Sequence, residues 1–401
     1  MRRHPIVQAL LAGKLTTAML VLELALTFAV AANVLSVVAS SFSLMSEPSG
    51  IGEGVVGIVE LEDFGTGRQG FTSGEAILQA RSVPGVASAA WVRALPFGSD
   101  LVGSIFPGPG TDDQALGISV SQFEGGPGAI GTMGLELVAG RDFLPNEYVE
   151  QGSEGAAGPA ATILTESLAR QLFGTPDATG RLVFTDSGAS LRVVGVVKRL
   201  LRPHPVQGAG SVNHYSMLLP EVPSVDRGVL LFRTMGPLRG RTMRAMEERL
   251  SAFAGGAKAR TFAESRSAFF KRDVEKSTLL LGATLSLLLV TAIGIGGLAT
   301  FRVRRSRRSI AIRRALGATK SRIILGFQAE SAALAIISIL LGAPAALALH
   351  RVLMKVLEVQ ALAPSSVAMC ALLIVFVVQL SSLGPSLKAT AIDPAQAVKR
   401  R

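Results

Sequence analysis

Residues suited to catalysis are few and scattered in this chain. Its four histidines are His4, His204, His214 and His350; His204 and His214 share one region, but two histidines without a third ligand are more often surface residues than a metal site. The sequence has no His-Glu-x-x-His motif, no Gly-x-Ser-x-Gly turn and no Gly-x-x-x-x-Gly-Lys-Ser/Thr phosphate loop. We therefore expect no enzyme, and no binding of a metal or ATP by this chain itself.

The most unusual run is residues 302–322, RVRRSRRSIAIRRALGATKSR, which holds nine Lys or Arg and no acid. Within it, Ile312 and Leu316 are four residues apart, so they would share one face of a short helix while Arg313 and Arg314 point elsewhere. Such an amphipathic helix is suited to receive another protein. The alternative is a basic anchor that only lies on anionic lipid headgroups.

Four apolar segments are long enough, or nearly so, to cross a membrane: residues 19–38, 279–300, 332–349 and 367–383. A span needs about 20 helical residues for about 30 Å of hydrocarbon. The composition, 49% apolar and 17% charged, agrees. We predict an α-helical membrane protein with four transmembrane helices and a large α+β extracytoplasmic domain inserted between helices 1 and 2.

The distribution of charge predicts the orientation. The formal net charge of the chain is +11. Residues 42–276 hold 22 basic and 25 acidic residues, a net charge of −3, so the rest of the chain carries +14. That excess lies in short segments beside the apolar runs, which is typical of the cytoplasmic side. We expect both termini and residues 302–322 in the bacterial cytoplasm, 42–276 outside the cytoplasmic membrane, lipids as partners and no nucleic acid.

The N-terminus admits two interpretations. Arg2 and Arg3 precede an apolar run that contains Ala29-Val30-Ala31, as in a cleavable signal peptide. The run continues to about Val38 and contains Glu23, which favours an uncleaved spanning helix. The first 14 residues would lie at the membrane interface as an amphipathic helix or form a disordered tail.

The large exported region has the pattern of a mixed α+β domain. The valine-rich residues 191–200 are typical of a buried strand, residues 165–173 of a helix, and the Gly- and Pro-rich residues 103–131 of loop or irregular strand. Residues 152–159 are expected to form a small-residue loop. The predicted order is 1–41, interfacial segment and transmembrane helix 1; 42–276, exported domain; 277–301, helix 2; 302–330, cytoplasmic coupling loop; 331–350, helix 3; 366–386, helix 4; and 387–401, cytoplasmic tail.

Three polar side chains fall well inside the predicted spans, where burial in lipid is costly. Glu23 and Asn33 lie in the first span and Gln379 in the fourth. Glu23 and Asn33 are ten residues apart, within about 80° of one line along a helix. These residues could form a seam between helices or a conduit. Glu23, and Glu330 at the start of the third span, could instead reach the interface or be neutralised by a basic neighbour.

Several separate segments resemble the MacB/FtsX-like permease subunits of ABC transporters. RRSIAIRRALGATKSRI resembles the family's Arg-Glu-Ile-Gly-Ile-Arg-x-Ala-Leu-Gly-Ala signature, and AIDPAQAVKR resembles its Asp-Pro-x-x-Ala-Leu-Arg ending. The segments AGRDF, TESLARQLFG and VVGVVK resemble recurrent sequence motifs of the family's periplasmic domain. The order of one span, a large domain and three further spans also agrees with the family. Two departures are Ser309, where the family has an acid, and Ala311, where it has glycine.

The resemblance implies a transporter subunit without a fused ATPase domain. Its partners would be two copies of a separate ABC ATPase, which bring ATP and Mg, a second permease copy and, in some members, a periplasmic adaptor protein. The residues matching the signature would couple to the ATPase: Ser309, Ile310, Ile312, Arg313, Arg314, Ala315, Leu316, Gly317 and Ala318.

The implied function is mechanotransmission, in which cytoplasmic ATP hydrolysis moves the extracytoplasmic domain and exports a peptide, an antibiotic or a lipoprotein-like substrate. Four spans with few polar groups would make a poor aqueous pore, which agrees. The alternative is a non-transporting regulator of cell-envelope enzymes. Relatives of that kind tend to have a small exported domain, so the long region here favours export. A membrane sensor would need a cytoplasmic signalling domain, for which few residues remain.

Overall fold

The computed structural model describes residues 14–62, 72–99, 101–108, 117–150, 160–224, 227–253, 255–357 and 362–390. The chain divides into two compact units: a helical unit, Met1–Ser43 with Arg272–Arg401, and an α+β unit, Leu44–Lys271. The predicted interfacial segment before residue 14, the loop at 152–159 and the C-terminal AIDPAQAVKR motif lie outside the described residues.

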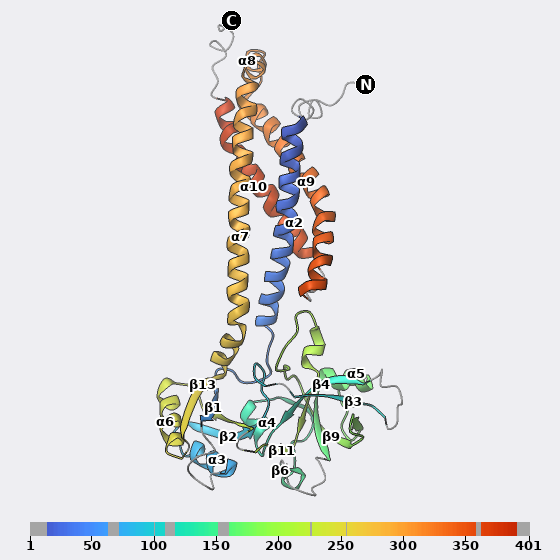
Figure 1. Ribbon diagram of the computed structural model, residues 1–401, viewed down its shortest axis with the longest axis vertical. Helices are drawn as coiled ribbons and strands as arrows, with labels where there is room; N and C mark the ends of the chain where they lie inside the picture. Colours follow the sequence, from blue (N-terminus) through green and yellow to red (C-terminus); the bar gives the residue numbers. More distant parts are fainter. Residues whose placement is uncertain are drawn as a thin grey trace. The chain divides into compact units, whose positions relative to one another are not determined.

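Among the described residues, four helices are long and apolar enough to cross a membrane, which confirms the predicted number. They are α2 (Lys14–Met45), α7 (Phe262–Arg305), α9 (Lys320–Leu357) and α10 (Pro364–Thr390) (Figure 1). Their buried side chains form one cluster, which includes Phe28 of α2, Ala335 of α9 and Ile374 of α10. The α2 span is 56% buried and the other three are at most 28% buried, so α2 is the most enclosed helix of this unit.

The helices extend beyond the apolar runs. α7 ends at Arg305 and α9 begins at Lys320, so the segment predicted as a coupling loop, 302–330, is mostly helical. A short helix, α8 (Arg307–Ala315), lies between them. Lys, Arg, Gln and Glu are good helix formers in water, so a helix can continue past the apolar residues that mark its passage through hydrocarbon.

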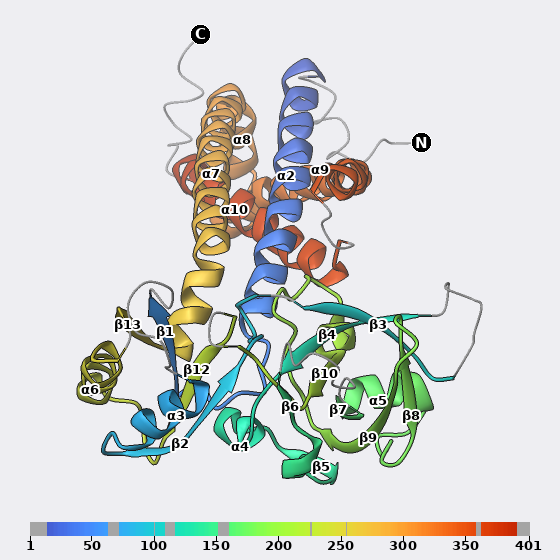
Figure 2. The same cartoon turned by 60° about the horizontal axis from the view of Figure 1, so that its bottom comes forward.

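One sheet of the α+β unit has four antiparallel strands in the order β13-β1-β12-β2. One face packs on α3 (Ser73–Arg81) and α6 (Gly240–Ser251), as Figure 2 shows. Because successive residues of a strand point to opposite faces, Phe232 packs toward these helices and Leu231 toward the rest of the unit. The strands are β1 (Val56–Glu62), β2 (Val86–Val92), β12 (Val229–Thr234) and β13 (Gly256–Thr261).

A second sheet has seven strands in the order β5-β9-β7-β10-β4-β3-β8, and β8 also pairs with β9. Six of its strands therefore close into a ring. Leu168 and Ala169 of α5 (Glu166–Phe173) are buried against apolar residues of these strands. The strands are β3 (Val102–Phe106), β4 (Ile118–Glu124), β5 (Leu137–Gly140), β7 (Ala161–Thr165), β8 (Leu182–Thr185), β9 (Ser190–Val197) and β10 (Ser216–Leu219).

Short elements complete the unit and decide one prediction. The Gly- and Pro-rich residues 103–131, expected to be loop or irregular strand, contain most of β3, all of β4 and the start of α4 (Ala129–Met133), so the strand alternative holds at β3 and β4 and the helix was not expected. A side chain at Gly117 would come within 2.8 Å of the Phe106 ring, so this glycine permits close strand packing. The remaining short elements are η2 (Pro145–Glu147), β6 (Val149–Glu150), η3 (Gly210–His214) and β11 (Glu221–Val222).

Candidate coupling surface

One face of α8 is fixed to the helical unit. Ile310 is 4% exposed and Ala311 is 1% exposed. Ile310 clusters with Val303 of α7, Ile323 of α9 and Ala389 of α10. The helix is too short to be stable alone in water, so this contact with three membrane helices fixes its place.

The other face of α8 is open. Ile312 is 47% exposed and Leu316, the residue that ends the helix, is 82% exposed. Ser309, Arg313 and Ala315 are also exposed. The structure thus presents the two apolar side chains that the sequence placed on one face, on a helix whose opposite side is anchored.

Gly317 ends α8 by its backbone conformation. Its φ is +93°, and a Cβ built there would meet no atom within 4 Å. The constraint is therefore conformational, because only glycine adopts positive φ without strain. The amide of Gly317 donates to the carbonyl of Arg314 at 3.0 Å and that of Ala318 to the carbonyl of Arg313 at 3.0 Å, which closes the turn into α9.

The two arginines of the signature have different surroundings. Arg314 is half-buried, and its Nη1 donates to the carbonyl oxygen of Thr390, the last residue of α10, at 3.1 Å. A cation is favoured there, because the carbonyl end of a helix is negative. Arg313 is exposed. Arg314 therefore holds α8 against α10, while Arg313 is accessible to a partner.

An ion pair lies one turn inside the bundle from α8. Nη1 of Arg302, on α7, is 2.7 Å from Oε1 of Glu330, on α9, and both side chains are mostly buried. Nη2 of Arg302 also donates to Oγ1 of Thr17, on α2, at 3.1 Å. Glu330 is thus neutralised by a basic neighbour, as one of the two interpretations held, and the neighbour is an arginine of the basic run.

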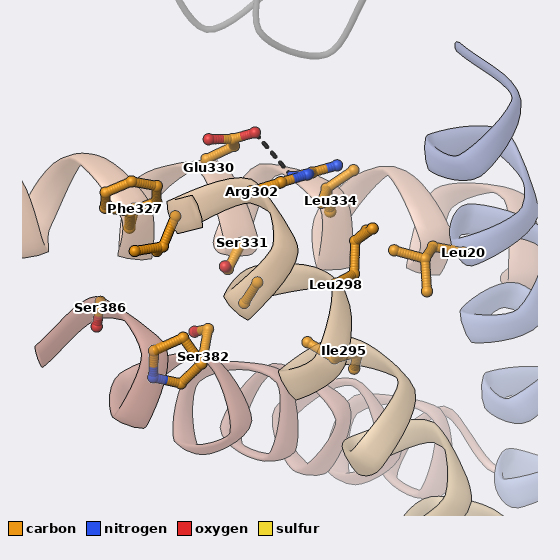
Figure 3. Close-up of a pocket in the computed structure, with 13 residues that line it drawn as sticks. Leu20, Ile295, Leu298, Arg302, Phe327, Glu330, Ser331, Leu334, Ser382 and Ser386 are labelled. Carbon is orange, nitrogen blue, oxygen red and sulfur yellow. Dashed lines mark hydrogen bonds and ion pairs between the residues drawn. The ribbon is translucent and has the colours of Figure 1, made fainter. Parts of the chain in front are cut away.

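Beside this ion pair is a small cavity of about 30 Å³, which all four membrane helices line. Figure 3 shows Arg302 and Glu330 on one side and Ser382 and Ser386 of α10 on the other. The volume is enough for about one water molecule, and polar groups are available to bind it. Val303 belongs both to this cavity and to the cluster that holds Ile310, so the cavity and α8 share a wall.

The three intramembrane polar residues do not gather at one place. Nδ2 of Asn33 donates to the carbonyls of Ala29 and Ala346, and its Oδ1 is 3.0 Å from Nδ1 of His350 on α9. Since that amide nitrogen is committed as a donor, Oδ1 accepts from His350, whose Nδ1 carries the hydrogen. Asn33 therefore joins α2 to α9.

Glu23 and Gln379 have other neighbours. A Cβ at Gly294 of α7 would lie 3.7 Å from the Glu23 carboxylate, so Glu23 lies beside α7. One turn further along α2, Thr27 and Thr291 lie 3.2 Å apart, Oγ1 to Oγ1. The carbonyl of Gln379 accepts from Ser382 at 3.1 Å on its own helix, α10. Oε1 of Gln379 is buried without a hydrogen-bond partner. Glu23, Asn33 and Gln379 therefore have separate surroundings and do not form one continuous line.

Two motifs of the α+β unit prove to be one feature. Gly140 of AGRDF pairs with Gly195 of VVGVVK where β5 meets β9, and a Cβ on either glycine would collide with backbone of the other strand. Beyond the pair, Arg141 forms a bidentate ion pair with Glu147, at 2.8 and 2.7 Å. The hydrogen bond from Arg141 holds the pKa of Glu147 below its usual range. The AGRDF and VVGVVK motifs therefore determine the backbone geometry where β5 pairs with β9.

Sequence reasoning missed the contacts between distant residues at this surface. It did not find the pairing of Arg302 with Glu330, the bond from Arg314 to Thr390 or the burial of Ile310. An acid ten residues into α9, opposite a run of arginines, was the available signal for the first. The others depend on where α10 ends in space.

Comparison with known families gives two matches that together cover most of the chain. The MacB-like periplasmic core domain family matches residues 17–251, more than half of the chain. The FtsX-like permease C-terminal family matches residues 281–394, which include α8. No match was found among curated proteins.

Solved structures with similarity to this chain include the following three domains. The extracellular domain of the ABC-type transporter YknZ from Gram-positive bacteria has 14% identity and a TM-score of 0.34, covering 51% of this chain and 100% of that one. The periplasmic region of MacB from Actinobacillus actinomycetemcomitans has 14% identity and a TM-score of 0.35, covering 58% and 98%. A permease domain from Porphyromonas gingivalis has 16% identity and a TM-score of 0.34, covering 54% and 92%.

The two family matches confirm the resemblance drawn from the signature, the exported phrases and the layout of spans. The described helices supply the four membrane-crossing segments that such a permease needs. The chain therefore belongs to the MacB/FtsX-like family of ABC transporter permeases, a family of bacterial membrane proteins that work with ABC ATPase partners.

Proposed function

We propose that this chain is the permease subunit of an ABC exporter and that α8 receives the movement of a separate cytoplasmic ATPase. The observation that carries the proposal is the two-sided environment of α8. Ile310 is buried against three membrane helices, while Ile312 and Leu316 are exposed on the other side. Force applied to the exposed face would reach α7, α9 and α10 through the buried one.

The exposed face fits a groove on a partner protein. A short amphipathic helix that inserts apolar side chains into a groove is a recurrent mode of recognition. Arg313 is free to pair with an acid at the rim of that groove, and the segment contains no acid that would compete. The loss of the family's acid at Ser309 leaves this apolar face intact.

The connection to the exported domain runs through α7. This single helix contains residues 262–271 of the α+β unit and residues 272–305 of the helical unit. Its last turns pack with α8 through Val303. An unbroken helix supports transmission of motion from the ATPase to the extracytoplasmic domain, which is the proposed mechanotransmission.

The proposed assembly contains two ATPase copies, which bind ATP and Mg, and two copies of this permease in the cytoplasmic membrane, with a periplasmic adaptor as a further partner. Leu285, Leu340 and Leu372, on three different helices, are each more than half exposed and would face lipid or the second copy. The proposed cargo is a peptide, an antibiotic or a lipoprotein-like molecule. The second candidate, a regulator of cell-envelope enzymes, would use the same α8 contact.

The test replaces the apolar face of α8 by charge. In the double variant Ile312→Asp, Leu316→Asp, two carboxylates would have to enter an apolar groove, at a cost of several kcal/mol. We expect at least a ten-fold loss of the ABC ATPase that co-purifies with the permease, identified and quantified by mass spectrometry. Ser309→Asp is the matched control, because it adds charge to the same exposed face of α8 at the position where the family signature itself has an acid, and it should spare recovery.

The basic-anchor interpretation predicts the opposite result. Its arginines remain in the double variant, so the ATPase would be recovered in full. Full recovery of the ATPase by a double variant that is correctly inserted in the membrane would show that α8 is not the docking element.

A further inference from the structure

The α+β unit is joined to the helical unit by two chain connections only, at Ser43–Leu44 and at Lys271–Arg272. The residues just inside the α+β unit are 44–53, which comprise the end of α2 and the chain after it, and 262–270, which begin α7. Both segments belong to one packed cluster, which we call the junction: Glu47, Ser49, Glu53, Phe97, His214, Phe262, Arg266, Phe269 and Phe270.

Arg266 is the residue that binds both connections. Its Nη2 donates to the backbone carbonyl of Glu47, and its Nη1 is 3.2 Å from Oε1 of Glu53. The same carboxylate oxygen accepts from Oγ of Ser49 at 2.6 Å. One side chain of α7 therefore holds the chain that leaves α2 at two points six residues apart.

Phe97 supports Arg266 from a third segment. The Arg266 guanidinium lies 5.0 Å from the centroid of the Phe97 ring, a cation–π contact. The ring packs at 5.5 to 5.8 Å, centroid to centroid, on Phe262, Phe269 and Phe270 of α7. Phe97 is thus enclosed by the first three turns of α7.

Two features of the junction are locally unfavourable. Phe97 has φ +66°, and among the described residues no other non-glycine has a positive φ. Nε of Arg266 is buried without a hydrogen-bond partner. Strained backbone and unsatisfied buried groups persist only where surrounding contacts hold them, and they concentrate at sites that move or bind.

His214 holds the side chain of Glu47, whose backbone carbonyl is bound by Arg266. Its Nε2 lies 3.0 Å from Oε1 of Glu47, and its carbonyl accepts a hydrogen bond from Oγ1 of Thr165, at the start of α5. The segment after α2 is therefore tied through Arg266 to α7 and through His214 to the closed sheet.

We infer that Arg266 is a positioning residue that locks the two chain connections together, so that motion of α2 and α7 reaches the α+β unit as one displacement. This inference rests on the proposed function, because it concerns how ATPase-driven motion is passed on. Without Arg266, α7 and the segment after α2 would move independently inside the α+β unit.

The test is hydrogen exchange with mass spectrometry on the full permease–ATPase complex, without nucleotide and with ATP on a hydrolysis-deficient ATPase. In the unsubstituted complex, we expect ATP to change exchange both in α8 and in residues 44–53. In Arg266→Ala, the change in α8 should remain and the change in 44–53 should be lost. Arg266→Lys should restore part of it, because an ammonium can still pair with Glu53.

Arg141→Ala is the matched control, since it removes another Arg–Glu pair of the α+β unit away from the junction and should leave both changes intact. Faster exchange in β7 and β9 of Arg266→Ala would show that the substitution has loosened the whole α+β unit. In that case Glu53→Gln, which keeps the shape of the side chain, replaces Arg266→Ala as the test variant. A change in 44–53 that survives both substitutions would overturn the role of Arg266. No ATP-dependent change in α8 of the unsubstituted complex would instead contradict the proposed function.

Discussion

At the turn after α8, neighbouring residues of one signature have separate tasks. Arg314 binds the end of α10, Leu316 is open to solvent and Gly317 supplies the positive φ that turns the chain into α9. Leu316 and the exposed Ile312 and Arg313 are available for the proposed contact with a partner. The signature thus combines residues that fix the structure of α8 and its turn with residues that are exposed for the proposed contact.

The ion pair of Arg302 with Glu330 gives a prediction at this scale. Its side chains are 22% and 16% exposed, so removing one partner leaves a poorly solvated charge between helices. We expect Glu330→Gln or Arg302→Gln to destabilise the helical unit by about 1–3 kcal/mol, between the values typical of surface and of buried pairs. Thermal unfolding of the permease in detergent measures the loss.

The exchanged pair, Arg302→Glu with Glu330→Arg, is the control. It restores the attraction, and a glutamate at 302 can accept a hydrogen bond from the hydroxyl of Thr17. We expect it to recover more than half of the stability lost by either single variant. If the stability loss of the exchanged pair equals the sum of the losses of the two single variants, the two side chains do not stabilise each other.

How far individual residues could be assigned from the sequence depends on the range of the interaction. The relation of Ile312 to Leu316 is local, because the two residues are four positions apart along the chain, and both side chains are exposed. Arg302 and Glu330 are 28 residues apart, and Arg314 and Thr390 are 76 apart. Contacts at such separations follow from how helices pack, which periodicity does not encode.

At the scale of elements, patterns of apolar residues predicted the four spans, the strand β9 and the helix α5. They were ambiguous where glycine has a tertiary role. Gly103 belongs to β3 and Gly117 directly precedes β4, but the sequence left loop and irregular strand both open, because close strand packing and chain turns both call for glycine. The helices continue beyond the predicted spans, since only their apolar parts are distinctive in the sequence.

Close packing of α9 on α2 gives the prediction at this scale. A Cβ at Gly342 would lie 2.7 Å from the carbonyl oxygen of Ala25 and 2.9 Å from the ring of Phe28, so Gly342→Ala must push the two helices apart. We expect a loss of about 1–3 kcal/mol, as for other overpacked cores. Unfolding of the permease by increasing denaturing detergent would measure it.

Gly326, on the same helix, is the matched control. A Cβ there would meet no atom within 4 Å, and alanine favours a helix over glycine by about 1 kcal/mol. Gly326→Ala should therefore be neutral or stabilising. Equal destabilisation by both substitutions would show that flexibility of α9, and not its contact with α2, is what the glycines provide.

At the scale of the whole molecule, charge and apolarity are divided between the two units. Residues 42–276 are close to neutral, while the basic excess flanks the membrane helices. The large basic group at 302–322 includes all of α8, whose exposed face is the proposed contact for a cytoplasmic ATPase. In the predicted orientation, membrane topology and coupling are therefore linked in one segment, because the residues that would retain α8 on the inner side are neighbours of those that would bind the partner.

This linkage makes topology the decisive prediction for the whole chain. Because Lys and Arg are retained on the cytoplasmic side, we expect residue 312 to be cytoplasmic and residue 150, in the α+β unit, to be outside. Paired reporter fusions at these two positions, one reporter active only in the cytoplasm and one only outside it, should give opposite compartments. An odd number of crossings separates the two positions in the predicted arrangement, since α7 alone lies between them as a membrane-crossing helix of the described chain. Both reporters in one compartment would mean that α7 does not cross the membrane, and α8 could then not connect a cytoplasmic ATPase to an exported domain.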